Sequence, residues 1–272
     1  MTNTHTITSQ DWQKFEIDFP EPRGGQATFV VAGHKTGSVL LNNIIADIQT
    51  VTGLPAVPVE TSLWKQGLNI KDWPQELYDL LEQDGLVYMS FRDLQKLPQL
   101  ASFQHGKRIF MIRDPRDVAV SYFFSMSQSH TLPKEGDARE GLIKMRETAS
   151  GFDIDQFIQK GMANAVLRNI ESFAHFLNTE NTVFYKYEDI IFDKESWVAQ
   201  IASDLEVEIP QNDIERIAKK HDIRPSKEDP SAHIRSVTPG GYTAKIKPET
   251  IAYIQQNFPK FFSEYGYEKD PV

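Results

Sequence analysis

The stretch "FVVAGHKTGSVLLNNI", residues 29–44, decides the fold class of this chain. It opens with branched and aromatic apolar residues, which favour a buried strand. A short polar loop from Gly33 to Ser38 follows, and apolar residues at helical spacing begin at Val39. A strand, a short loop and a helix in this order present main-chain N–H groups to an anion at the start of the helix. The stretch therefore predicts a phosphate-binding loop.

The lysine of this loop stands in an unexpected place for an ATP site. A Walker A loop follows G-x-x-x-x-G-K-[ST], with the lysine after the last glycine. Here Lys35 precedes Gly37 and Ser38. We still expect the N–H groups of Gly37, Ser38 and Val39 to point at an anion, and Lys35 to reach it from the strand side. Taken alone, the loop fits a plain strand–helix turn equally well.

Composition and charge exclude several classes of protein. The chain has 272 residues, 40% of them apolar and 25% charged, which fits a globular fold. Its 29 basic and 38 acidic residues give a net charge of −9, which argues against general affinity for nucleic acids or anionic membranes. The lack of cysteine excludes disulfides, thiolate nucleophiles and cysteine metal sites. No apolar run approaches the roughly 20 residues of a membrane span. We expect a cytoplasmic protein without membrane insertion.

The order of the predicted elements indicates an α/β fold. Strands are expected at 28–32, 86–90, 109–112 and 182–185. Helices are expected at 39–50, 73–84, 118–127, 155–177, 196–205 and 213–221. This alternation predicts a parallel sheet flanked by helices on both faces, a three-layer α/β/α arrangement with ligands beyond the carboxyl ends of the strands. Residues 1–26 are expected to form a loosely structured lead-in, and residues 27–272 a single domain.

Two segments without clear periodicity are expected to be irregular. Residues 127–141, "SQSHTLPKEGDAREG", are polar and rich in turn formers, so they fit a mobile loop over a site or a plain surface insertion. Whether residues 127–150 act as a lid stays open. The second segment runs from Arg224 to about Pro248. Long irregular segments in compact domains are often functional.

A second junction between strand and helix lies in "RIFMIRDPRDVAVSYFF", residues 108–124. Asp114 suits the cap of the helix, Pro115 its first position, and Asp117 the acid of a capping box. For Arg116 we expect an exposed, solvated charge. Local helix signals thus account for Asp114, Pro115 and Asp117 without a role in binding.

Two residues of the same segment are not explained by helix signals. Arg113 stands at the end of the strand, and Ser121 follows within the helix. A guanidinium group and a hydroxyl near a helix start form a second anion site, and the arginine fork suits a terminal phosphate.

These motifs resemble those of one enzyme family. The loop at residues 35–38, "KTGS", resembles the 5′-phosphosulfate loop of the cytosolic-type sulfotransferases, and "RDPRDVAVS", residues 113–121, closely matches that family's 3′-phosphate motif. "YKYEDI" at 185–190 is similar to the segment whose tyrosine lies near the adenine, and "RSVTPGGY" at 235–242 to the loop that closes over the 3′-phosphate. The resemblance implies a P-loop-like fold and sulfuryl transfer from 3′-phosphoadenosine 5′-phosphosulfate (PAPS), and a bacterial enzyme acting on small molecules. The donor-binding residues it implies are Lys35, Thr36, Gly37, Ser38, Val39, Arg113, Ser121, Tyr187, Arg235, Ser236 and Gly240.

The chain departs from the family pattern at three places. The family commonly has a tryptophan that stacks on adenine soon after the glycine of the loop. That position falls near Val39 and Leu40 in this chain, so other apolar contacts must hold the adenine. Ser236 and Val237 stand where a basic residue and a glycine usually follow the arginine of the C-terminal loop. The segment that usually delivers a catalytic histidine, "YMSFRDLQKLP" at 88–98, has none.

Catalysis then needs another base. His34 adjoins Lys35 and titrates in a suitable range, so it is the first candidate. Asp93 follows the strand that usually carries the histidine, and Glu60 fits the wall of an acceptor pocket; each also fits a structural or solvent-facing role. Lys35 is expected to stabilise the leaving 5′-phosphate. No metal is implied, because lysine and arginine neutralise the phosphates.

Two other functions compete with sulfuryl transfer. A P-loop kinase or ATPase shares the strand–loop–helix arrangement, but Walker A order is absent and Arg113 has no role in that scheme. The missing histidine favours a non-catalytic nucleotide-binding protein. The acceptor is expected to be a small molecule carrying a hydroxyl or an amine. The sequence does not indicate the oligomeric state.

Overall fold

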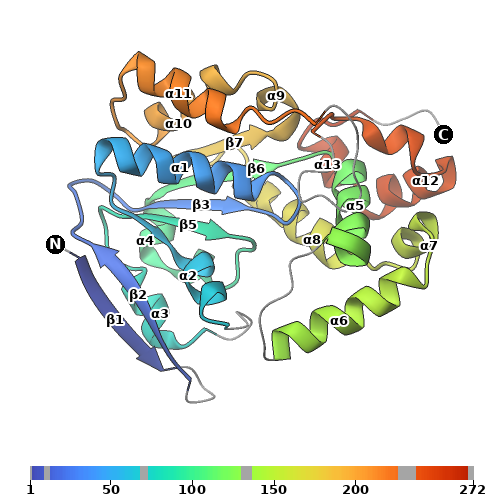
Figure 1. The fold of residues 1–272 in the computed structure, drawn as a ribbon, viewed down its shortest axis with the longest axis horizontal. Helices are drawn as coiled ribbons and strands as arrows, with labels where there is room; N and C mark the ends of the chain where they lie inside the picture. The colour runs from blue at the N-terminus through green and yellow to red at the C-terminus, as the bar shows by residue number, and fades with distance from the viewer. Residues whose placement is uncertain (1, 9–12, 68–72, 130–136, 226–236, 269–272) are drawn as a thin grey trace.

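The computed structural model describes residues 2–8, 13–67, 73–129, 137–225 and 237–268 (Figure 1). Its strands are β1 (Thr2–Thr8), β2 (Lys14–Pro20), β3 (Thr28–Ala32), β4 (Ala56–Pro58), β5 (Val87–Phe91), β6 (Lys107–Ile112) and β7 (Thr182–Lys186). Its α-helices are α1 (Ser38–Thr52), α2 (Val59–Lys65), α3 (Gln75–Leu80), α4 (Ala101–His105), α5 (Pro115–Phe124), α6 (Asp137–Ser150), α7 (Ile154–Gln159), α8 (Asn164–Ser172), α9 (Tyr187–Ile190), α10 (Lys194–Asp204), α11 (Gln211–His221), α12 (Pro248–Asn257) and α13 (Lys260–Ser263). Short 3₁₀ or π turns are η1 (Leu97–Gln99), η2 (Ser125–Ser129), η3 (Phe173–Phe176) and η4 (Gly241–Ala244).

Five parallel strands form the central sheet, in the order β4-β5-β3-β6-β7. Alternate residues of β3 face opposite layers: Phe29 and Val31 pack with one apolar cluster, and Val30 and Ala32 with the other. The first cluster contains residues of α3, α4, α8 and the C-terminal helices, and the second contains residues of α1, α10 and α11 (Figure 1). Burial on both faces explains the continuous apolar strands. The predicted three-layer α/β/α fold is confirmed.

The N-terminal segment differs from the expected loose lead-in. β1 and β2 pair antiparallel from Thr2 opposite Pro20 to Thr8 opposite Lys14. In "KFEIDFP" the apolar residues alternate with charged ones, and Phe15, Ile17 and Phe19 are buried. Period-two alternation of this kind is a strand signal. The expectation of a loosely structured segment was therefore wrong, because the hairpin buries one face against the domain.

Several helices also differ from their expected bounds. The helix expected at 155–177 is divided into α7, α8 and the turn η3. The segment expected as a polar loop at 127–141 contains the end of η2 and the start of α6, and residues 130–136 lie outside the described ranges. Of the irregular stretch after Arg224, the described part contains η4 and leads into α12. In the parts of the chain that the structure describes, no helix is both long and apolar enough to cross a membrane.

Candidate active site

The sheet topology brings the sequence motifs to one edge. The Lys35 loop follows β3, the Arg113 motif follows β6, and Tyr187 follows β7, and these three strands are neighbours in this order. On the other side of β3, the segment with Asp93 follows β5, and Glu60 follows β4. Because parallel strands end at the same edge of a sheet, all five segments meet there.

The Lys35 loop folds as a tight turn into α1. The Thr36 hydroxyl and main-chain N–H both donate to the Gly33 carbonyl, at 2.8 and 3.3 Å. Lys35 adopts a positive φ of 68°, which is uncommon outside glycine. Gly37 caps α1 at φ 103° and, having no side chain, accepts no hydrogen bond from the first turn. The first N–H groups of a helix have no partner within it, so the start of α1 offers unfilled donors to an anion.

Gly37 is required by space as well as by conformation. A Cβ added there would lie 2.6 Å from the Met111 side chain and 3.1 Å from the Tyr187 ring. Both distances are shorter than ordinary contacts between carbon atoms. The loop therefore lies directly on the β6 strand and on Tyr187.

Tyr187 joins three of the sequence motifs. Its ring packs under Gly37, the Arg113 guanidinium lies 4.1 Å from the ring centroid, and its hydroxyl donates to the Val237 carbonyl at 3.1 Å. The side chain is buried, which raises the pKa of its hydroxyl. The structure thus brings the Lys35 loop, the Arg113 motif and the C-terminal loop together, as the sequence predicts.

Arg113 is buried at this junction with part of its guanidinium group unsatisfied. Nη1 donates to the Lys35 carbonyl at 3.4 Å, and Nη2 lies 3.7 Å from the Asp117 carboxylate. Its Nε is buried and has no hydrogen-bond partner among the described residues. A buried polar atom without a partner is rare and costs free energy. This donor fits a group that can accept a charge-assisted hydrogen bond, such as a phosphate.

Asp117 plays a different part from the one expected of it. Its carboxylate accepts from the main-chain N–H groups of Gly240 and Tyr242, at 2.7 and 3.0 Å. The cap of α5 is Asp114, which accepts from the Arg116 N–H. The capping-box prediction for Asp117 was wrong, because the acid ties α5 to the C-terminal loop instead. Burial raises the pKa of Asp117.

The expectation of a solvated Arg116 was also wrong. The side chain is 4% exposed. Its Nε and Nη2 donate to the two oxygens of Asp114 at 2.9 and 2.6 Å, and its guanidinium lies 4.4 Å from the Tyr242 ring centroid. The bidentate pair and the aromatic contact replace the water that a buried charge loses. Arg116 is thus part of the packing beneath the site.

Glu188 is a residue of the site that sequence reasoning missed. Its carboxylate accepts from the main-chain N–H of Asp114 at 2.9 Å and from the Tyr267 hydroxyl at 3.0 Å. Burial raises the pKa of Glu188. The acid holds the Arg113–Asp114 turn against the end of β7. Its position directly after Tyr187 was the available signal.

The remaining residues predicted to bind the donor have fewer contacts that fix their place in the site. Ser121 is half-buried and lies one turn beyond Asp117 on the same face of α5. Val39 is 43% exposed at the start of α1. Gly240 is exposed and donates to Asp117. Arg235 and Ser236 lie outside the described residues.

The three candidates for the base differ in environment. Glu60 is 7% exposed in the first turn of α2, and burial raises its pKa to about 8 although the main-chain N–H of Arg92 donates to it. Asp93 also has a pKa raised by burial, and its Oδ1 has no partner among the described residues. The His34 side chain is exposed. Glu60 and Asp93 thus lie close together, because the Asp93 charge contributes to the raised pKa of Glu60.

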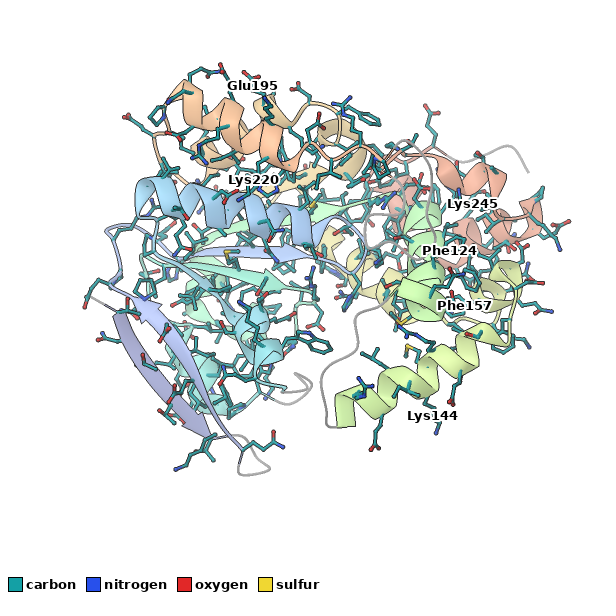
Figure 2. All side chains as sticks on the ribbon, viewed as in Figure 1. Phe124, Lys144, Phe157, Glu195, Lys220 and Lys245 are labelled. Carbon is teal, nitrogen blue, oxygen red and sulfur yellow. The ribbon has the colours of Figure 1, made fainter. Side chains whose placement is uncertain are left out.

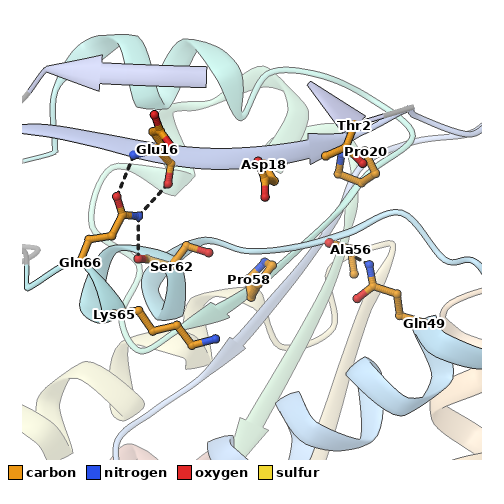
Figure 3. Close-up of a pocket in the computed structure, with 10 residues that line it drawn as sticks. All are labelled: Thr2, Glu16, Asp18, Pro20, Gln49, Ala56, Pro58, Ser62, Lys65 and Gln66. Carbon is orange, nitrogen blue, oxygen red and sulfur yellow. Dashed lines mark hydrogen bonds between the residues drawn. The ribbon is translucent and has the colours of Figure 1, made fainter. Parts of the chain in front are cut away.

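The other described features do not add ligands to this edge. Among the described residues, no group of three or more His, Cys, Asp or Glu side chains could hold a metal ion. A surface hollow lies between the β1–β2 hairpin and α2, where Gln66 bonds to the main chain of Glu16 (Figure 3). Its lining contains none of the predicted site residues. Phe124 and Phe157 lie where α5 meets α7 (Figure 2).

A family model for the sulfotransferase domain matches residues 26–250. The chain belongs to the sulfotransferase domain family. It is a sulfotransferase, an enzyme that transfers a sulfuryl group. The match covers the Lys35 loop, the Arg113 motif and the C-terminal loop in one domain.

Individual relatives are distant in sequence. The chain is 24% identical to 3-alpha-hydroxysteroid sulfotransferase of Cavia porcellus over 223 residues, which cover 80% of this chain and 71% of the relative. Its fold is similar to that of mouse sulfotransferase SULT7A1 complexed with PAP, with 16% identity, a TM-score of 0.58, and coverage of 89% of this chain and 85% of the other. It is also similar to retinol dehydratase in complex with androsterone and inactive cofactor PAP, with 14% identity, a TM-score of 0.51, and coverage of 97% and 91%.

Proposed function

We propose that this sulfotransferase binds PAPS along the carboxyl edge of β3, β6 and β7, and transfers the sulfuryl group to a hydroxyl or amine of a small-molecule acceptor. The observation that carries the proposal is the buried Nε of Arg113, which has no partner among the described residues. It lies beside the start of α1, where the glycine cap offers no side-chain acceptor to the first N–H groups, so two sets of donors face one edge. PAPS carries two separate anionic groups on its ribose, a 3′-phosphate and a 5′-phosphosulfate, which fits two such sites.

The Lys35 loop is proposed to hold the 5′ end of the donor. The N–H groups of Ser38 and Val39 would bond the 5′-phosphate, with Thr36 and Gly37 fixing the turn. As the acceptor atom bonds to sulfur, the bond from sulfur to the 5′-phosphate oxygen breaks and charge develops on that oxygen. The Lys35 ammonium would stabilise this charge, and fixed cations of this kind act without reorganisation. Lysine and arginine would neutralise the phosphates without a metal.

The 3′-phosphate is proposed to bind between α5 and the C-terminal loop. Arg113 and Ser121 would contact it from α5, and Arg235, Ser236 and Gly240 from the loop. The bonds from Asp117 to the loop support this arrangement, because they fix the loop next to Arg113. Tyr187 would lie beneath the nucleoside.

We propose Glu60 as the general base. Its burial supports this choice, because a carboxyl with a pKa of about 8 exchanges a proton near neutral pH. The acceptor O–H or N–H proton would pass to Glu60 as the new bond to sulfur forms. Asp93, with its pKa also raised by burial, is the second candidate. His34 is exposed, which leaves it as the third.

An apolar body is proposed for the acceptor. Trp64 lies on α2, one turn after Glu60 and on the same face, and is 39% exposed. An exposed indole near the proposed base suits an apolar or aromatic small molecule. The similar proteins described above are named for a hydroxysteroid and for retinol, and the second was solved with androsterone. The cytoplasm stays the predicted compartment, because the N-terminal residues are polar and the sequence has no long apolar run.

Calorimetric titration without magnesium tests the donor site. We expect 3′,5′-adenosine bisphosphate (PAP) to bind about tenfold or more tightly than adenosine 5′-monophosphate, since the second phosphate adds charge-assisted hydrogen bonds. Transfer of labelled sulfate from PAPS to 4-nitrophenol, used as a probe acceptor, then tests turnover. Binding of ATP only with magnesium, and no binding of PAP, would contradict the proposal.

A further inference from the structure

Ser90 has an unusual backbone conformation near the end of β5. Its φ is 76°, in the left-handed region that residues with a Cβ rarely adopt. The pairing of β5 with β3 shifts here: Phe29 pairs with Tyr88, but Val31 pairs with Phe91. β5 therefore carries one extra residue, a bulge, between these two pairs. Such strained positions persist only where the surrounding structure holds them, and they gather at functional sites.

The bulge turns the Ser90 side chain toward α2. The residue is 2% exposed, and its hydroxyl oxygen accepts a hydrogen bond from the Thr61 main-chain N–H at 3.1 Å. Thr61 is the third residue of α2, so this N–H is one that the helix itself leaves unpaired. The hydroxyl thus fixes the first turn of a helix of only seven residues.

A second hydrogen bond joins α2 to the residue that directly follows β5, and it involves Glu60, the acid next to Thr61. The carboxylate of Glu60 accepts from the main-chain N–H of Arg92, two residues after Ser90. The Asn169 side chain in turn donates to the Arg92 carbonyl at 2.6 Å, which holds this part of the backbone. Two neighbouring residues of α2 are therefore bonded to two positions of one short segment, Ser90 within the bulge and Arg92 directly after β5.

We propose that Ser90 is a positioning residue for sulfuryl transfer: its hydroxyl fixes the first turn of α2 so that the Glu60 carboxyl stays buried on the Arg92 N–H. The proposal rests on the role of Glu60 as the base, proposed above. Among the described residues, the charged groups that act on Glu60 are Arg92 and Asp93, both of which follow β5. Movement of α2 relative to β5 therefore changes both the burial and the charges that Glu60 experiences.

Ser90→Gly is the decisive variant, because glycine accepts the positive φ and removes the hydroxyl without adding strain. Ser90→Ala removes the same hydroxyl while it keeps the Cβ, and serves if the glycine variant does not fold. Ser102→Ala is the matched control. Ser102 is also a buried serine; it lies at the start of α4, and its hydroxyl donates to the Leu81 carbonyl. The helix α4 leads into the N-terminal end of β6, which is the end away from the site.

The protonation of Glu60 can be followed without an acceptor. In protein labelled with ¹³C-glutamate, the Glu60 carboxyl signal is assigned as the one that is missing from the NMR spectrum of Glu60→Gln. This signal is then followed as a function of pH. The wild-type signal is expected to titrate near pH 8, where burial places its pKa. In Ser90→Gly the first turn of α2 loosens and Glu60 gains water, so its pKa falls by about one unit or more. Ser102→Ala leaves it unchanged.

Turnover gives the second measurement. With PAPS and 4-nitrophenol, kcat of Ser90→Gly is expected to fall about tenfold to a hundredfold, while the dissociation constant of PAP stays at its wild-type value. The kcat of Ser102→Ala stays near that of the wild type. An unchanged Glu60 titration in both Ser90 variants would overturn the positioning role, whatever the activity. A wild-type protein that binds no PAP would instead overturn the proposed function, and the NMR titration would still decide the Ser90–Glu60 coupling.

Discussion

The two halves of the site edge handle charge in opposite ways. On the side of β6 and β7, both arginines are paired with acids: Arg116 with Asp114, and Arg113 with Asp117. On the side of β4 and β5, Glu60 has no ion-pair partner within the described ranges, and burial raises its pKa to about 8. Both halves are buried, so the difference lies in the partners and not in the exposure.

This difference matches what each half is proposed to do. A phosphate keeps its charge throughout the reaction, so the side that holds it needs cations fixed in advance. A base must gain a proton during the reaction, and it does this best when its pKa lies near the working pH. Pairing Glu60 with a close cation would lower its pKa and make it a weaker base. The lack of a close ion pair at Glu60 is therefore consistent with its proposed role.

The largest effect is expected from Glu60→Gln. With 4-nitrophenol as the acceptor, kcat falls about a thousandfold, because the amide cannot take the proton. In the wild type, activity rises with pH through about 8, as the carboxyl loses its proton. Because the folded-state pKa is raised, the wild type loses stability as the pH rises from the ordinary carboxyl range toward 8, and the variant does not. Thermal unfolding at pH 5 and pH 8 measures this: Glu60→Gln gains melting temperature relative to the wild type only at the higher pH.

Asp93→Asn is the control for this prediction. Asp93 lies at the same edge and also has a pKa raised by burial, so a general effect of removing an acid would appear in both variants. We expect the kcat of Asp93→Asn to stay within about tenfold of the wild type. If Asp93→Asn abolishes sulfuryl transfer while Glu60→Gln retains it, the general base is Asp93. The base then still lies on the β4–β5 half of the site edge.

A smaller effect is expected on the phosphate side from Arg113→Ala. The dissociation constant of PAP rises about tenfold to a hundredfold, since one or two charge-assisted hydrogen bonds are lost. Adenosine 5′-monophosphate lacks the 3′-phosphate, so its affinity changes much less. Calorimetry with both ligands measures the difference, and the pH profile of kcat stays as in the wild type. Equal losses for the two ligands would place Arg113 away from the 3′-phosphate.

The sequence predicted how the Lys35 and Arg113 segments come together better than it predicted the surroundings of Glu60. The Lys35 and Arg113 motifs are continuous segments at strand ends, and strand order alone brings such segments together. The environment of Glu60 depends instead on how α2 packs on β5, through the bulge at Ser90. Nothing in the residues around Glu60 or Ser90 signals this contact.

Two wrong predictions on the phosphate side have the same cause. Local spacing assigned Asp117 to its own helix, but the carboxylate bonds the N–H groups of Gly240 and Tyr242, more than a hundred residues away. Arg116 was assigned to solvent, yet its guanidinium packs on the rings of Tyr242 and Phe262, which also come from the C-terminal part of the chain. Sequence patterns predict partners within the same helix. They carry no information about contacts with a loop that is distant in the sequence.

The smallest effect, a difference between two glycines of one helix, tests how closely the phosphate side is packed. Gly37 and Gly53 flank α1 and both have positive φ, but a Cβ on Gly37 would meet Met111 and Tyr187, whereas one on Gly53 would meet no atom within 4 Å. Gly53→Ala should cost only the conformational strain, about 1 kcal/mol of unfolding free energy. Gly37→Ala adds the clash, for a total of about 2–4 kcal/mol. It also shifts the start of α1, so PAP binds about tenfold more weakly. Denaturant unfolding and calorimetry on both variants measure the difference. Equal losses of unfolding free energy and equal PAP affinities in the two variants would mean that the Lys35 loop adjusts to the added Cβ. The half of the site edge at β6 and β7 would then not be rigidly packed.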